Sequence, residues 1–164
     1  MFAKRLAVLS AAVVGVVLIF GVVQAGAAGP TKVLKFEDTP GTFTPIGFNP
    51  NTLPPVGSRY VITVRLKNDG VQFGKPSGAT VGRVLVECTV LAIVTAETAD
   101  GNCFGIAHVP DGFFTFQGNG PLTNAKVNYW AITGGIGPYA NARGQIKVTN
   151  HADGTSAAVV SLYS

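Results

Sequence analysis

The sequence predicts an all-β protein, built as a single antiparallel barrel or sandwich of eight strands. Segments that alternate or run rich in β-branched residues recur at short, even spacing between turn-forming residues, as in antiparallel β proteins. Beyond the N-terminal segment, almost no stretch has apolar residues at i, i+3, i+4 and i+7 over a helical length, so helices are not expected there.

The expected strands are separated by turn chemistry. Asn, Asp and Gly stand where a hairpin needs positive φ, for example at Asn68-Asp69-Gly70 and Asp153-Gly154. The eight strands that we expect are Val33–Glu37, Tyr60–Leu66, Arg83–Val94, Cys103–Val109, Phe113–Gln117, Lys126–Thr133, Gly144–Thr149 and Ser156–Tyr163.

The first 28 residues have the layout of a secretory signal peptide. Lys4 and Arg5 precede an apolar run, Leu6 to Val23, that holds no ionisable side chain. Small residues follow, and we expect cleavage after Ala25 or Ala28, export of the mature protein from the cell, and no stable membrane association afterwards. The alternative is a retained anchor, because the run is near the lower limit of roughly 17–25 residues that span a bilayer.

The mature chain is long enough for one domain. We expect a signal peptide at 1–28, an N-terminal strand and Pro-rich loop at 29–57, and a β-barrel domain at 58–164. Without Lys4 and Arg5, 10 basic and 8 acidic side chains remain, and the basic ones are scattered. This pattern argues against a nucleic-acid partner, which would require a basic patch.

The stretch from Thr39 to Gly57 differs from the rest of the chain. It contains five prolines and shows no clear period-two pattern, so we expect a long ordered loop. Such a loop could cover a cavity mouth, or it could be an extended connector.

The expected strand Arg83–Val94 is apolar on both faces. One face would pack the core or line a cavity, and the other would suit a partner subunit, so a homo-oligomer is a hypothesis. The two cysteines, Cys88 and Cys103, form an even pair in an exported chain, which predicts a disulfide.

The segment Ala131–Gly144 reads AITGGIGPYANARG and resembles the ITGGTGxFxxARG signature of dirigent proteins and their bacterial relatives. No Lys-Ser/Thr follows its glycines, which argues against a phosphate-binding loop. The resemblance extends over roughly Tyr60 to Tyr163 and implies the dirigent and allene oxide cyclase superfamily. Its members have a calycin-like, eight-stranded antiparallel β-barrel, usually in a dimer or trimer, whose interior can hold a hydrophobic small molecule.

The resemblance also implies a chemistry. Members direct phenoxy-radical coupling or cyclise an unsaturated fatty-acid epoxide without cofactor or metal. Arg143 matches the Arg of the signature, whereas Pro138 stands where some dirigent proteins have an acidic residue.

If the barrel is catalytic, a buried carboxyl could donate a proton, and an Arg or Tyr could hold an oxyanion. Candidate catalytic residues are Glu87, His108 and Arg143; candidate ligand-binding residues are Tyr60, Tyr129 and Arg143; Glu37 or Asp38 is a further candidate acid. The alternatives are a non-catalytic secreted ligand-binding barrel and a structural barrel with a filled interior. A cavity in which a carboxyl and an Arg converge would favour catalysis, and an entirely apolar cavity would favour carriage.

Overall fold

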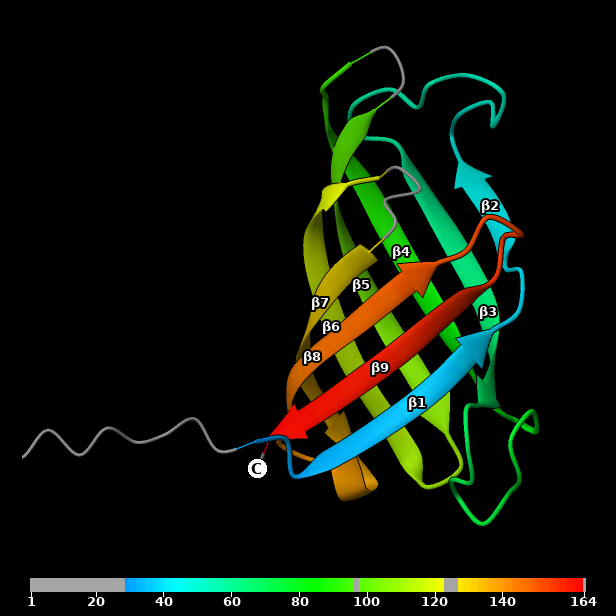
Figure 1. Cartoon of the computed structure of the whole chain (residues 1–164). Helices are drawn as coiled ribbons and strands as arrows, with labels where there is room; N and C mark the ends of the chain where they lie inside the picture. Colours follow the sequence, from blue (N-terminus) through cyan, green and yellow to red (C-terminus); the bar gives the residue numbers. More distant parts are fainter. Residues whose placement is uncertain (1–28, 96–97, 123–126, 164) are drawn as a thin grey trace, which may run out of the picture.

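The protein is a closed antiparallel β-barrel, as the sequence predicts (Figure 1). The computed structural model describes residues 29–95, 98–122 and 127–163, so the expected signal peptide and the expected strand residue Lys126 lie outside the described part. The elements are β1 (Lys32–Asp38), β2 (Thr42–Ile46), β3 (Arg59–Asn68), β4 (Thr80–Ile93), β5 (Ala99–Val109), β6 (Gly112–Pro121), β7 (Val127–Ile136), the 3-10 turn η1 (Gly137–Tyr139), β8 (Arg143–Asn150) and β9 (Ser156–Tyr163). Within the described ranges, no helix is long and apolar enough to cross a membrane.

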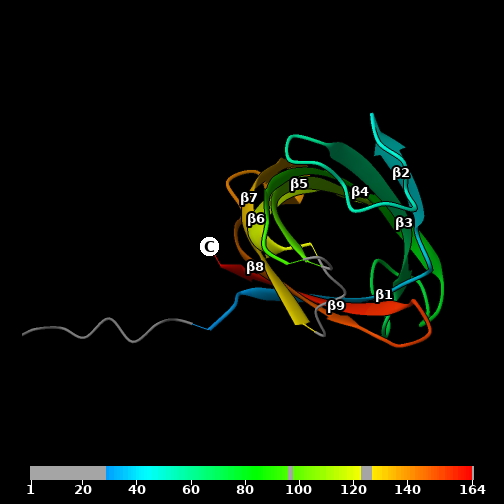
Figure 2. The same cartoon turned by 90° about the horizontal axis from the view of Figure 1, so that it is seen from above.

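Eight strands close the barrel in the order β1-β9-β8-β7-β6-β5-β4-β3. The ring closes because β1 pairs along its whole length with β9, while its last three residues also pair with the end of β3. Viewed along its axis, the barrel is a ring of strands (Figure 2). All of the strand pairings are antiparallel, as expected from the short turns between consecutive strands.

The ninth strand, β2, corrects the sequence prediction for the Pro-rich stretch. Thr42–Ile46 pairs with the first half of β3, beyond the point where β1 leaves it. Pro45 has no N–H to donate, but β2 is the last strand of the sheet order, where an edge position tolerates proline. A strand that contains proline and lacks clear period-two alternation cannot be predicted from the sequence pattern alone.

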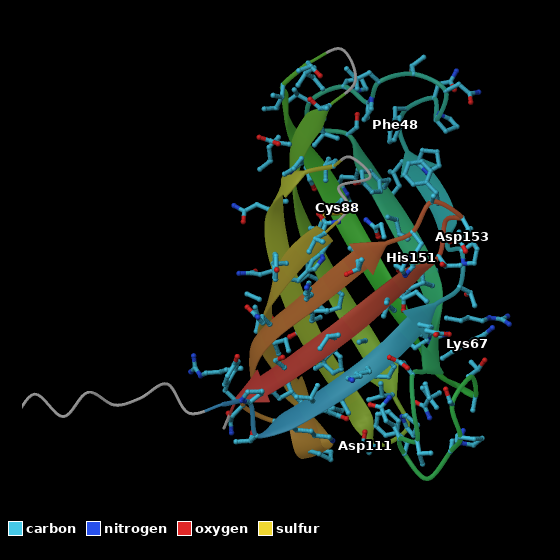
Figure 3. All side chains as sticks on the ribbon, viewed as in Figure 1. Phe48, Lys67, Cys88, Asp111, His151 and Asp153 are labelled. Carbon is cyan, nitrogen blue, oxygen red and sulfur yellow. A yellow bond between two sulfur atoms is a disulfide. The ribbon has the colours of Figure 1, made fainter. Side chains whose placement is uncertain are left out.

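One end of the barrel is filled by side chains. Tyr139 of η1 is fully buried there, with its ring 5.4 Å from that of Phe114. Its hydroxyl donates to Asp111 Oδ1 at 2.9 Å and accepts from Lys32 Nζ at 3.3 Å. Burial, and then the neighbouring Asp111 carboxylate, raise the pKa of the Tyr139 hydroxyl well above its usual range. Asp111 marks this closed end in Figure 3, and Phe48 marks the other end.

The dirigent-like segment therefore has a structural role in this chain. A Cβ at Gly135 would lie 2.7 Å from Tyr139 Cβ, so the glycine lets β7 pass directly against Tyr139, the residue that plugs this end of the barrel. Tyr139 itself occupies the aromatic position of the signature and packs back onto the barrel.

The predicted disulfide is confirmed. Cys88 of β4 and Cys103 of β5 are direct cross-strand partners and are bonded to each other. Both are buried on the inner face, with 2% and 3% of their surface exposed. The bond therefore ties two neighbouring strands of the wall together from within.

Candidate functional site

The open end of the barrel leads into a cavity of about 560 Å³. Its outermost residues stand at the ends of β1, β6 and β8, at the opposite end from Tyr139. Side chains that alternate along the strands provide most of the lining: Phe36, Asp38, Tyr60, Ile62, Val64, Leu66, Val84, Val86, Cys88, Cys103, Ala107, Phe114, Phe116, Asn128, Trp130, Ile146, Val148, Asn150, Ala158 and Val160.

Much of the cavity wall is apolar and partly aromatic. The rings of Phe116 and Trp130 meet edge to face, with their centroids 5.6 Å apart. Gly105 makes room for this pair, because a Cβ there would collide with the Phe116 ring. Such a surface suits a hydrophobic ligand with flat faces.

Asp38 is the one carboxyl among the described residues of the lining. It is the last residue of β1 and lies between β9 and β3, where its Cα partners are Ser156 and Leu66. Its Oδ2 accepts a hydrogen bond from Ser156 Oγ at 2.9 Å. Its Oδ1 is buried and has no hydrogen-bond partner among the described residues.

This environment changes the acidity of Asp38. Burial disfavours the charged carboxylate and raises the pKa to about 6, although the Ser156 hydrogen bond acts in the opposite direction. A carboxyl with this pKa exchanges its proton close to neutral pH, which is a common property of catalytic acids and bases.

The register of β1 decides between the two acids that the sequence left open. Successive side chains on a strand point to opposite faces, so only one of two neighbours can face the interior. Glu37 is exposed and opposite Lys67, whereas Asp38 lines the cavity.

Of the predicted ligand-binding residues, Tyr60 and Tyr129 border the cavity. Tyr60 is 8% exposed, and desolvation raises the pKa of its hydroxyl. Its ring lies 5.0 Å from Phe43 of β2, which in turn lies 6.4 Å from Phe48, so aromatic residues of the Pro-rich stretch gather beside the wall. Tyr129 is 60% exposed and belongs to the rim.

The structure does not bring Glu87, His108 and Arg143 to this cavity. Glu87 lies between two inward-facing residues of β4, so its own side chain points outward, where Oε1 pairs with Arg59 Nε at 2.7 Å.

His108 lies on the outer face of β5. Its ring is 5.6 Å from that of Phe113, in a shallow depression shared with Arg65 and Arg83. Arg143 is exposed at the start of β8, opposite Tyr163. The convergence of a carboxyl and an Arg, which would have favoured catalysis, is therefore absent from the described lining, which combines mostly apolar walls with a single carboxyl.

Sequence reasoning did not single out Trp130, Asn128 and Asn150, which also line the cavity. Asn128 and Trp130 share one face of β7, as their period-two spacing requires. This spacing could have shown from the sequence alone that the two side chains lie together. Nothing in the sequence showed that this face was the inner one.

No family model matches the chain, and no curated protein matches it. Among solved structures, a pyocyanin demethylase is 23% identical with a TM-score of 0.66, and the alignment covers 80% of this chain and 100% of the other. A pterocarpan synthase dirigent protein is 15% identical with a TM-score of 0.57 and coverages of 80% and 82%. A Diels-Alderase from Streptomyces koyangensis is 15% identical with a TM-score of 0.61 and coverages of 80% and 64%. At these identities the likeness is one of fold: the chain has the same barrel fold as these proteins, a dirigent protein among them, as residues 131–144 predicted.

Proposed function

We propose that the protein binds a hydrophobic small molecule inside the barrel and steers its cyclisation or coupling, with Asp38 moving a proton. One observation carries the proposal: a half-buried carboxyl, whose Oδ1 is fully buried and whose pKa is raised to about 6, lines an otherwise mostly apolar cavity of about 560 Å³. Apolar walls supply binding and exclude water, and a carboxyl supplies acid-base chemistry where water is excluded.

The cavity would act first by restricting shape. A flexible unsaturated molecule held against Phe116 and Trp130 is confined to few conformations, which favours ring closure in one geometry. Cyclisation is an isomerisation and requires no co-reactant, whereas oxidative coupling would require an oxidant supplied from outside the cavity.

Asp38 would act second. In its protonated form it can donate to a developing oxyanion or alkene, and in its ionised form it can accept the proton that the product must lose. Ser156 occupies Oδ2, and Oδ1 is left for the ligand.

The structural neighbours support a small-molecule function of this kind. They include proteins described as a dirigent protein, a Diels-Alderase and a heme-binding cyclase of [4 + 2] cycloaddition. We also propose that the mature protein is secreted, since a signal-like N-terminus and a disulfide occur together in the same chain.

The catalytic proposal is tested by offering unsaturated epoxides and polyenes to the purified mature protein and analysing the products by chiral chromatography. Asp38→Asn should lower turnover by about 10²–10⁴-fold while the ligand still binds, because the cavity is unchanged. Glu37→Gln is the matched control, with an outward carboxyl one residue away, and it should leave turnover unchanged. Full turnover by Asp38→Asn would refute the catalytic role.

A non-catalytic carrier is the second candidate, favoured by the apolar character of the remaining wall. A pair of variants tests occupancy of the cavity for both candidates. Val86→Phe fills part of the cavity and should abolish ligand retention, whereas Leu85→Phe, on the outer side of the same strand, should not. If Val86→Phe retains as much ligand as the protein without the substitution, the cavity is excluded as the binding site. A ligand that is retained but never converted, with or without Asp38, would identify a carrier.

A further inference from the structure

We propose that the cavity selects hydrophobic ligands that carry a positive charge and rejects those that carry a carboxylate. This inference deepens the proposed ligand-binding function and depends on it. It concerns the charge of the ligand, which neither the fold nor the size of the cavity determines.

The first support is the balance of charge in the wall. Among the described residues that line the cavity there is one carboxyl, Asp38, and no Lys, Arg or His. The neighbouring basic residues of β3, Arg65 and Lys67, flank the inward-facing Leu66 and therefore belong to the outer face. When Asp38 is ionised, the described part of the cavity holds an uncompensated negative charge.

The second support is the unpaired oxygen. Oδ1 of Asp38 is buried without a donor among the described residues, while Oδ2 is already bonded to Ser156. Buried polar atoms in proteins are normally hydrogen-bonded, so an orphan at a cavity wall marks a place where a ligand atom fits. An ammonium or ring N–H⁺ would supply the missing donor and form a charge-assisted hydrogen bond.

The third support is the aromatic wall. Phe36, Tyr60 and Trp130 all line the same cavity as Asp38. The faces of such rings attract cations, most strongly where water is excluded. A hydrophobic cation would therefore gain binding affinity from the Asp38 carboxylate and from the aromatic walls together.

An anionic ligand meets the opposite conditions. Its carboxylate would enter a low-dielectric space that already contains one negative charge, with no cation among the described lining residues to offset either charge. A fatty-acid-type substrate could enter only with its head group kept outside the barrel. The chain thus departs in charge from the fatty-acid epoxide chemistry that the resemblance implied.

The elements around Asp38 contribute few other titratable groups. β9 presents Ser156 and β3 presents Leu66. Glu37 is on the outer face of β1, and His151 and Asp153 lie at exposed positions in the turn between β8 and β9 (Figure 3). Because histidine as a residue type ordinarily changes charge between pH 5 and 8, the variant His151→Gln serves as a control for every pH series.

The test uses three matched planar probes at roughly pH 8, where Asp38 is ionised and acridine is neutral. The probes are N-methylacridinium as the cation, acridine as the neutral molecule and acridine-9-carboxylate as the anion, each titrated against the purified mature protein by fluorescence. We expect the cation to bind about tenfold or more tightly than acridine, and the anion about tenfold or more weakly. On acidification to about pH 5, the affinity for the cation should fall toward that of the uncharged cavity, in the unchanged protein and in His151→Gln alike.

Asp38→Asn keeps an oxygen that can accept from Ser156 and removes the charge. It should still bind acridine and should lose the preference between the charged probes, while Glu37→Gln should keep it. Equal binding of all three probes by the unchanged protein, or a preference for the anion, would overturn this inference and leave the cavity as a binding site. Failure of all three probes to bind would overturn the inference, whereas the proposed function is overturned only if the unsaturated epoxides and polyenes are also neither retained nor converted. If Asp38→Asn does not fold, the pH series on the unchanged protein tests the same charge, and an affinity for the cation that does not change with pH would overturn the inference.

Discussion

Two adjacent acids, Glu37 and Asp38, have the same chemistry and opposite environments. Glu37 faces solvent, whereas Asp38 is enclosed by β9 and β3 and keeps one oxygen without a partner among the described residues. The same carboxyl group is thus an ordinary surface charge at one position and a proton-exchanging group near pH 6 at the next. The difference arises from burial, which acts on the charged form alone.

This difference makes the stability of the protein depend on pH. The pKa of Asp38 is raised from 3.8 to about 6 by folding, so the folded state binds the proton more tightly than the unfolded state does. The ionised Asp38 carboxylate therefore lowers the free energy of unfolding. This loss is absent below about pH 3.8, grows as the pH rises, and is fully present above about pH 6. A pKa difference of this size corresponds to on the order of 3 kcal/mol.

Asp38→Asn should therefore raise the free energy of unfolding at pH 7 by on the order of 1–3 kcal/mol, and the gain should vanish near pH 4. Denaturant titrations across this pH range measure the effect. Glu37→Gln should show no such pH-dependent gain. A loss of stability in Asp38→Asn at pH 7 would contradict the burial argument.

At the scale of elements, the segment from β7 to β8 shows what its glycines do. Gly144 has φ +151°, and a Cβ there would collide with the backbone carbonyl of Ser161 on β9. The close approach lets β8 pair with β9 from its first residue. The signature that indicated the fold is therefore a requirement of strand packing at the closed end, away from the cavity.

Gly144→Ala should destabilise the protein by several kcal/mol, on the order of 3, because neither the backbone of β8 nor that of β9 can move away cheaply. Gly154→Ala is the control: it has φ +83° but open space around it, so only the backbone strain of about 1 kcal/mol is expected. Thermal unfolding of both variants measures the difference. Equal losses would show that the contact with Ser161 contributes nothing.

The outer face of the neighbouring strands β3, β4 and β5 carries a row of basic residues. Arg65 and Arg83 are direct Cα partners, and so are Arg83 and His108. No carboxylate of a described residue lies within 4 Å of either arginine. Like charges placed opposite each other in a sheet are destabilising.

Arg83→Thr should therefore raise the free energy of unfolding by about 0.2–1 kcal/mol at low salt, with the gain reduced at high salt. Arg59→Thr provides the comparison, because Arg59 pairs with Glu87 at 2.7 Å on the same sheet; being an exposed pair, its loss should cost about 0–1 kcal/mol. Chemical denaturation at two salt concentrations distinguishes the two. A larger loss of stability in Arg83→Thr than in Arg59→Thr would rule out the repulsion.

At the scale of the whole molecule, the barrel is asymmetric along its axis. One end is plugged by Tyr139 and its hydrogen bonds, and the other opens into the cavity. A wall around a cavity lacks packing contacts on its inner side, so other interactions must hold its strands in place. The Cys88–Cys103 disulfide crosslinks β4 and β5 in this hollow half.

Loss of the disulfide should lower the free energy of unfolding by about 3 kcal/mol, the value expected for a loop of this length. The double variant Cys88→Ala/Cys103→Ala measures it in denaturant titrations with and without reductant. Reductant should destabilise the unchanged protein and leave the variant unaffected. Identical stability of the double variant and the unsubstituted protein in the absence of reductant would show that the crosslink does not stabilise the half of the barrel that surrounds the cavity.

The sequence by itself determined eight of the described strands, their turns and the disulfide, because these depend on local patterns: period-two alternation, turn residues and an even pair of cysteines. The choice of a barrel over a sandwich came from the resemblance of residues 131–144 to the dirigent signature. It missed β2, where Pro45 removes the local pattern and only pairing with β3 makes the strand. It also directed attention to Glu87, His108 and Arg143, which the folded chain keeps out of the cavity. Which face of each strand is inside, and which of Glu37 and Asp38 is buried, was decided only by closure of the barrel. A one-residue shift of register reverses every side chain, and the pKa of a carboxyl depends on the walls that surround it.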